Sequence, residues 1–189
     1  VVQKDDAGIP IKILEIDNDI TDRKQAEAAL LQKSRQEKLL WSVTQAIRQS
    51  LDLNAILNTT VTEVRQTLQV DRAAVYRFNL DFSGDFLVEA VGEDWVKLVE
   101  SGAGKVWEDT YLQETQGGRF LNKESFVIND IYRAGLQTCH VELLEQFQAK
   151  SYAVFPIFSG ENLWGLLAIY QNATPRNWQS WEIELLEQI

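Results

Sequence analysis

Cysteine, histidine and methionine are almost missing from this chain of 189 residues, which has one Cys, one His and no Met. A single cysteine rules out a disulfide within the chain and suits a reducing cytoplasm, where we expect the protein to reside. Zinc and iron sites need three or four Cys, His or carboxylate ligands at suitable spacing, so no metal site is expected. Because even position 1 lacks Met, we expect a fragment of a longer protein.

Basic charge and long apolar runs are also scarce. The chain has 18 Lys and Arg against 28 Asp and Glu, which gives a formal net charge of −10. This balance opposes binding to nucleic acids and anionic membranes, which relies on clustered basic residues. No run approaches the roughly 20 apolar residues of a membrane span, and no signal peptide is visible. Hydrophobic residues nevertheless make up 45% of the chain, enough for a well-filled core.

The first fifty residues differ in pattern from the rest. A β-rich stretch over residues 9–17 follows turn-forming residues at 5–8. Asp22 and Gln25 suit a helix start, because Asp accepts hydrogen bonds from unpaired amides and a Gln three residues on can reach back. A helical pattern runs from Arg23 to about Ser50. It fits either a solvated amphipathic helix on one domain or a linker helix paired with its twin in a homodimer, since the heptads are irregular.

The remaining sequence predicts an α+β fold, with helices flanking a largely antiparallel sheet. Periodicity places the elements in this order: a helix through residue 68, strands over 72–78 and 86–91, an irregular insert over 95–120, a strand over 125–129, a helix through Cys139, a hairpin of 151–158 and 163–171, and a final helix with Trp178, Trp181, Leu185 and Ile189 on one stripe.

Cys139 and His140 are the only thiol and the only imidazole of the chain, and they are neighbours in a helix-like run. A nucleophilic pair needs the two side chains to converge, whereas consecutive helical residues point about 100° apart. No kinase or cyclase motif is visible either, so we do not expect this segment to be an enzyme. Two interpretations remain: a small buried hydrophobe at Cys139, or an anchoring thiol beside a group that contacts what is anchored.

The order of elements resembles a GAF domain, and four sequence blocks narrow the resemblance. Residues 106–120, 127–132, 139–140 with 144–147, and 163–167 are similar to the signature stretches of cyanobacteriochromes, members of the phytochrome superfamily, and most similar to the red/green lineage. The resemblance covers roughly residues 40–189. Residues 1–22, with Asp-Ile-Thr at 19–21, resemble the C-terminal remnant of a PAS domain, and residues 23–50 would then be a linker or signalling helix.

The resemblance implies a photoreceptor domain that binds one linear tetrapyrrole (bilin) and switches between two coloured states by 15Z/15E isomerisation. Cys139 matches the cysteine that forms a thioether to ring A, and His140 matches the histidine packed near the inner rings. Asp109 matches the aspartate that accepts hydrogen bonds from the pyrrole N–H groups. A carboxylate there favours the protonated bilin in a low-dielectric pocket.

Three further positions match residues that contact the chromophore in this family. Arg119 matches the arginine that pairs with a propionate, for which its planar fork is suited. Trp107 matches the tryptophan that stacks on ring D, and Tyr170 a tyrosine near the same ring. Taken alone, both aromatic residues would more often belong to the core, as we expect for Trp164 and Phe155.

Three other positions depart from the red/green pattern. Tyr111 stands where many members have His, Phe120 where they commonly have Tyr, and Leu136 where a His is frequent. Each departure removes or changes a polar contact with the chromophore, and Tyr at position 111 also occurs in relatives that accept biliverdin. We therefore expect phycocyanobilin with red/green switching, and biliverdin with far-red absorption is the alternative.

The expected partners are the bilin, other domains of the same polypeptide through the flanking helices, and a second copy in a possible homodimer. The absence of a second cysteine excludes a two-cysteine photocycle. Two other classes of function compete with the photoreceptor. One is a pigment-free GAF domain that binds a small diffusible ligand such as a cyclic nucleotide, and the other is a purely structural dimerisation module.

Overall fold

The computed structural model describes residues 2–4, 6–8, 10–13, 21–49, 52–99 and 110–189. The chain forms two compact units, Val1–Arg35 and Gln36–Ile189. The first contains an antiparallel pair of strands, β1 (Val2–Lys4) and β2 (Pro10–Ile13), and the start of α1 (Thr21–Gln49). The β-rich stretch is thus confirmed over residues 10–13, and its residues 9 and 14–17 lie outside the described part. The assignment of this unit to a PAS domain stays a prediction.

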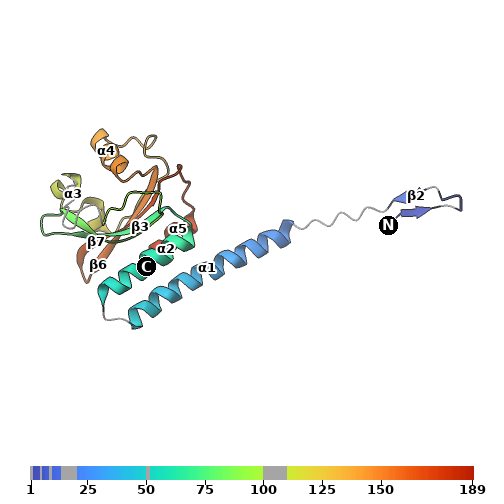
Figure 1. Cartoon of the computed structure of the whole chain (residues 1–189), viewed down its shortest axis with the longest axis horizontal. Helices are drawn as coiled ribbons and strands as arrows, with labels where there is room; N and C mark the ends of the chain where they lie inside the picture. The colour runs from blue at the N-terminus through green and yellow to red at the C-terminus, as the bar shows by residue number, and fades with distance from the viewer. Residues whose placement is uncertain (1, 5, 9, 14–20, 50–51, 100–109) are drawn as a thin grey trace. The chain divides into compact units, whose positions relative to one another are not determined.

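The second unit is built on a five-stranded antiparallel sheet in the order β4-β3-β7-β6-β5 (Figure 1). The strands are β3 (Arg72–Phe78), β4 (Gly84–Val91), β5 (Phe126–Ile128), β6 (Ser151–Ser159) and β7 (Asn162–Gln171). Together with its helices this sheet confirms the predicted α+β fold, and each predicted strand is present within two residues at either end.

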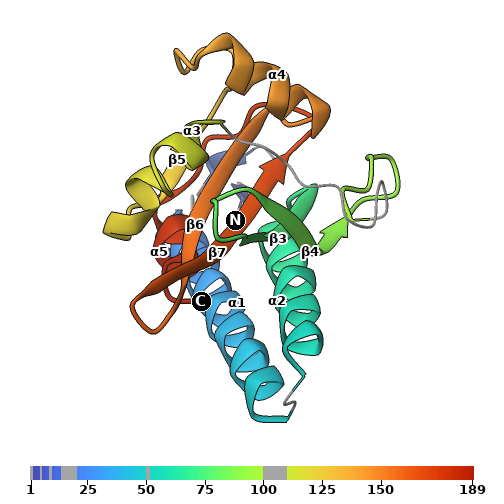
Figure 2. The same ribbon diagram turned by 90° about the vertical axis from the view of Figure 1, so that its left-hand side faces the viewer.

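Helices cover one face of the sheet. They are the part of α1 from residue 36 on, α2 (Leu53–Leu68) and α5 (Ser180–Leu186) (Figure 2). α2 begins where the Asp52 carboxylate accepts from the Asn54 amide at 2.9 Å, which satisfies an otherwise unpaired helix donor. Leu39 and Val43 of α1 join the apolar side of α2 in a core on this face. The C-terminal part of α1 is therefore a packed amphipathic helix.

Strand alternation sends the other side chains to the opposite face. In β7, Leu167 and Ile169 enter the helix-side core, whereas Leu166 and Tyr170 enter a second core. α3 (Thr110–Glu114), the 3₁₀ helix η1 (Gly118–Asn122) and α4 (Thr138–Gln146) lie over this second face (Figures 1 and 2). The sheet thus separates a layer of helices from a layer of shorter helices and loops.

Two expectations about core aromatics are resolved by the packing. Phe155 is buried in the helix-side core and Trp164 packs against it, as predicted. The final helix is shorter than expected, because Trp178 precedes α5 and Ile189 follows it. Trp178 is buried beside the helix, where its indole N–H donates to the Ile128 carbonyl at 3.2 Å.

Among the described helices, none has the length and apolar character that a transmembrane segment requires.

Candidate functional site

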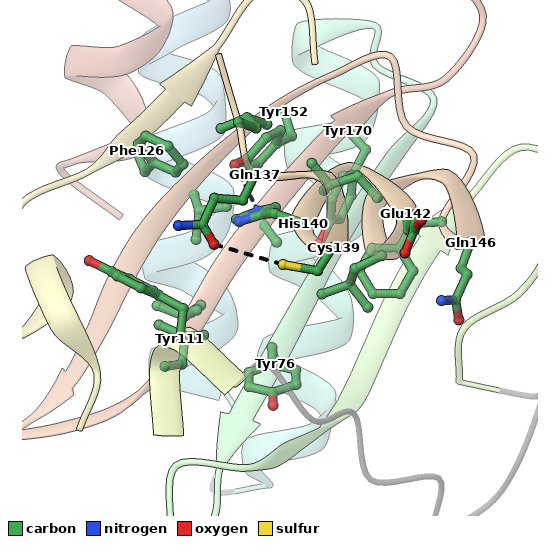
Figure 3. A pocket seen from close by; sticks show the side chains of 18 of the residues that line it. Tyr76, Tyr111, Phe126, Gln137, Cys139, His140, Glu142, Gln146, Tyr152 and Tyr170 are labelled. Atoms are coloured by element: carbon green, nitrogen blue, oxygen red, sulfur yellow. Dashed lines mark hydrogen bonds between the residues drawn. The ribbon is translucent and has the colours of Figure 1, made fainter. Parts of the chain in front are cut away.

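A cavity of about 820 Å³ lies on the face of the sheet that α1 and α2 do not cover. All five strands of the sheet supply part of its lining, α3 and η1 supply another part, and α4 with its flanking residues 135–137 and 147 supplies the rest (Figure 3). Its volume falls within the range of small-molecule and cofactor sites, roughly 300–1,000 Å³. The lining combines many aromatic side chains with a few polar groups, which is the composition of such sites.

α4 carries both Cys139 and His140 to this cavity. Leu144 and Phe147, at the other end of the helix, are buried in the second core and hold the helix against the sheet. The Cys139 side chain is exposed, with its Sγ 3.9 Å from the Gln137 side-chain oxygen (Figure 3). A thiol on the cavity wall that solvent can reach is available for covalent attachment. The interpretation of Cys139 as a buried hydrophobe is therefore wrong.

His140 points to the sheet rather than to the thiol. Its Nε2 lies 3.1 Å from the hydroxyl oxygen of Tyr152 on β6. The two neighbouring side chains of α4 thus have different surroundings within one cavity. No three His, Cys, Asp or Glu residues group into a metal site among the residues that the structure describes.

Gly117 and Gly118 form the turn that brings Arg119 into the cavity. Both glycines have positive φ, +96° and +53°, a backbone region that L side chains rarely adopt. A Cβ on Gly117 would lie 2.8 Å from Leu163 Cδ2, so this position also requires the absence of a side chain. Beyond the turn, the Arg119 guanidinium carbon lies 4.0 Å from the centre of the Phe126 ring. This cation–π contact orients the one Arg or Lys among the described lining residues.

The structure brings most of the predicted site residues together. Seven of them line the cavity: Cys139, His140, Arg119, Tyr111, Phe120, Leu136 and Tyr170. Phe120 and Tyr170 are buried, whereas Tyr111 is 47% exposed. The other two, Trp107 and Asp109, lie outside the described residues. Lining a cavity does not assign a role, so the contacts of all nine with a chromophore stay predictions.

Sequence reasoning named Tyr170 but missed Tyr152 and Phe126, which form an aromatic row with it on the sheet side of the cavity. Tyr152 pairs with Tyr170 across β6 and β7, and their rings are stacked with centres 6.3 Å apart. Phe126 packs edge-on against Tyr152 at 5.7 Å. The sequence did hold a clue to this row, because side chains alternate between the two faces of a strand and directly paired positions such as 152 and 170 share a face. It required the register of the hairpin, which the sequence did not supply.

Arg72, the first residue of β3, was also missed. It is fully buried, and its Nη1 donates to the Phe147 carbonyl at 2.9 Å, while its Nη2 donates to the Val96 carbonyl. Its Nε lies 3.4 Å from Glu89 Oε2. Burial lowers the pKa of Arg72, and the negative charge of Glu89 opposes this shift.

The buried guanidinium also lies 5.9 Å from the centre of the Tyr170 ring, at the edge of the cavity. Arg72 thereby joins a cavity aromatic to the end of α4 and to the loop after β4. This loop is further tied to the α4 side by the Val96 amide, which donates to the Gln148 side chain at 2.8 Å. The wall that carries Cys139 is thus fixed from behind by the polar contacts of a buried arginine and by this bond.

Comparison with known proteins places this architecture. The profile of the GAF domain matches residues 52–189. The red/green cyanobacteriochrome NpR6012g4, solved in its red light-absorbing state, is 55% identical, with a TM-score of 0.66 over 70% of this chain and 85% of that chain. JSC1_58120g3, solved in its far-red absorbing dark state with bound biliverdin IXα, is 38% identical, with a TM-score of 0.72 over 82% of this chain and 92% of that chain.

A putative methyl-accepting chemotaxis protein of Synechocystis is 32% identical over 159 residues, which is 84% of this chain. The chain spans only 15% of the length of that relative. The GAF profile covers more than half of the chain, and both of these solved structures are similar to it in sequence and in fold. The chain belongs to the GAF domain family and, within it, to the cyanobacteriochromes.

Proposed function

We propose that this domain is a photoreceptor module that holds one bilin in the cavity and attaches it through Cys139. The observation that carries the proposal is the position of the only thiol, exposed on a cavity of about 820 Å³ that Arg119 and His140 also line. Similar solved domains hold bilins, biliverdin IXα in one and phycocyanobilin in the GAF domain of a cyanobacterial phytochrome. When bound, the bilin supplies the absorption of light and the 15Z/15E isomerisation.

The lining residues fit such a ligand. A bilin is a large, flat, conjugated molecule with two propionate groups, and the aromatic row of Phe126, Tyr152 and Tyr170 offers flat apolar surface. Arg119 offers a planar fork that suits a carboxylate, already oriented by its stack on Phe126. The attachment would be an addition of S–H across a carbon–carbon double bond. It forms one C–S bond, transfers the thiol proton to carbon, and needs no oxidant and no leaving group.

The favoured chromophore is phycocyanobilin, with biliverdin as the alternative. Similarity supports both, since the red/green relative is 55% identical and the relative with biliverdin is 38% identical. Phe120 and Leu136 line the cavity where polar side chains are common in the red/green lineage. Fewer polar side chains leave Arg119 as the main carboxylate partner. For Asp109 and Trp107 we keep the roles that the resemblance implies, beside the pyrrole nitrogens and ring D.

The signal would leave the cavity through the sheet and the helices behind it. Tyr170 faces the cavity, and its neighbour Ile169 on β7 packs in the core that Leu39 and Val43 of α1 share. A change in the packing around Tyr170 therefore has a short mechanical route to α1, the flanking helix. Such a switch needs two arrangements of this layer with different affinity for the two bilin isomers. The output of the longer protein would then follow the position of α1.

The test is an absorption spectrum before and after illumination, on protein produced separately with phycocyanobilin and with biliverdin synthesis. We expect a reversible red-to-green change with phycocyanobilin, or a far-red band with biliverdin. A matched variant, Arg119→Lys, keeps the charge and loses the planar fork, so it should take up less pigment. A protein that stays colourless with both bilins would contradict the proposal and favour a GAF domain that binds a diffusible ligand.

A further inference from the structure

Tyr152 is held rigidly in contact with His140. Its side chain is 3% exposed, and its hydroxyl oxygen lies 3.1 Å from His140 Nε2 (Figure 3). The phenol ring stacks on Tyr170 with an interplanar angle of 23° and receives the edge of Phe126 on another side. Because neighbouring rings pack around the phenol, its hydroxyl group is held beside Nε2 in this structure.

The chemistry of the two groups decides which one donates. A neutral imidazole has one N–H and one bare nitrogen, and the hydrogen bond at one nitrogen fixes the state of the other. A phenol is a much stronger acid than a neutral imidazole N–H, and a bare imidazole nitrogen is a stronger base than a phenol oxygen. Of the two possible hydrogen bonds, the stronger is therefore the one in which the Tyr152 O–H donates to an unprotonated Nε2. The proton of neutral His140 then lies on Nδ1.

We propose that Tyr152 is a positioning residue that fixes His140 as its Nδ1–H tautomer. The consequence for pigment rests on the proposed function, whereas the tautomer itself does not. In this tautomer Nδ1 is a donor. It is complementary to a carbonyl or carboxylate oxygen of a bilin, and it does not match the pyrrole N–H groups, which are donors themselves. Tyr152 thus selects which kind of bilin atom His140 can bind.

The single histidine makes the tautomer directly measurable. In protein labelled with ¹⁵N-histidine, a long-range ¹H–¹⁵N correlation spectrum contains signals from His140 alone. The spectrum is recorded without pigment, well above the usual histidine pKa of about 6.5, so that the ring is neutral. We expect Nε2 at the shift of a bare nitrogen and Nδ1 at that of a protonated one. Tyr152→Phe should lower the ratio of Nδ1–H to Nε2–H about five-fold, the effect of one net hydrogen bond.

Tyr132→Phe is the matched control. It removes the same atom from a tyrosine that is 53% exposed and bonded to Glu145 and Lys150, outside the cavity lining. It should leave the His140 signals unchanged. A protonated Nε2 in the unmodified protein would overturn the proposal, even if Tyr152→Phe failed to fold. An unchanged ratio in folded Tyr152→Phe would overturn it too.

A second measurement separates this proposal from the photoreceptor proposal. With pigment bound, Tyr152→Phe should shift the absorption maximum, because His140 then presents a different hydrogen-bonding nitrogen, whereas Tyr132→Phe should not. A protein that never takes up pigment but shows the expected tautomers would refute the photoreceptor and keep the role of Tyr152. Pigmented Tyr152→Phe with an unshifted spectrum would refute the selection of the bilin atom.

Discussion

Removal of the Arg72 side chain should expose how strongly the cavity wall depends on its buried ion pair. In Arg72→Met, Glu89 stays buried without its cation and the Val96 carbonyl loses its Arg72 donor. The Phe147 carbonyl also loses Arg72 but keeps the Asn172 side-chain amide as a donor. Breaking a buried pair from one side commonly costs about 3–5 kcal/mol. Small domains have only about 5–15 kcal/mol of stability. The variant should therefore be folded but much easier to unfold with urea.

The pair can be isolated with a double-mutant cycle. Glu89→Gln removes the negative charge and keeps an oxygen that can accept from the Val99 amide, a contact of 2.9 Å. Because Arg72→Met/Glu89→Gln leaves neither charge buried alone, its cost should be smaller than the sum of the single costs by about 1–3 kcal/mol. The assay is urea unfolding monitored by tryptophan fluorescence. The free energies of unfolding are compared between variants that have the same dependence on urea concentration (the m-value). If the cost of the double variant equals the sum of the two single costs to within about 0.5 kcal/mol, the reasoning is refuted.

Two other predictions concern turns. Gly117→Ala should destabilise the domain by about 1–3 kcal/mol in the same assay, more than Gly135→Ala, whose φ is also positive but whose Cβ would meet nothing within 4 Å; equal costs would remove the steric argument. Hydrogen bonds from the Ser83 side chain and amide lower the pKa of Asp81 below its ordinary 3.8. The contribution of Asp81 to the stability of the fold is therefore present above pH 3.8 and is lost as the pH falls through the lowered pKa. Asp81→Asn should abolish this part of the acid dependence, and an unchanged acid titration of stability would contradict it.

Local pattern was sufficient for the strands, and the family resemblance carried by short sequence blocks was sufficient for much of the candidate site. Two apolar runs on either side of the turn at 159–162 predicted both strands of the hairpin. The Cys139-His140 pair and the Gly-Gly-Arg run, matched to the family, marked two walls of one cavity. These features depend on residues that are close together in the sequence. The exposure of Cys139 did not follow from its neighbours, because a small thiol on a half-apolar helix fits a core equally well.

The missed residues depend on contacts between distant parts of the chain. Arg72 is bonded to a carbonyl 75 residues away, and nothing near it in the sequence marks it as a buried cation. Tyr152 is important because of the facing His140, and their contact requires both the register of β6 and the position of α4. Such pairings are set by tertiary packing, which propensity and periodicity do not encode.

The most direct test of the central claim is the mass of the denatured protein after production with a bilin. The account predicts one added bilin per chain, located by peptide mapping on the fragment that contains Cys139 and absent from Cys139→Ala. Cys139→Ala should keep the fold, because this side chain is exposed. An unmodified mass for a protein that is coloured before denaturation, or a bilin attached to another residue, would contradict attachment through Cys139.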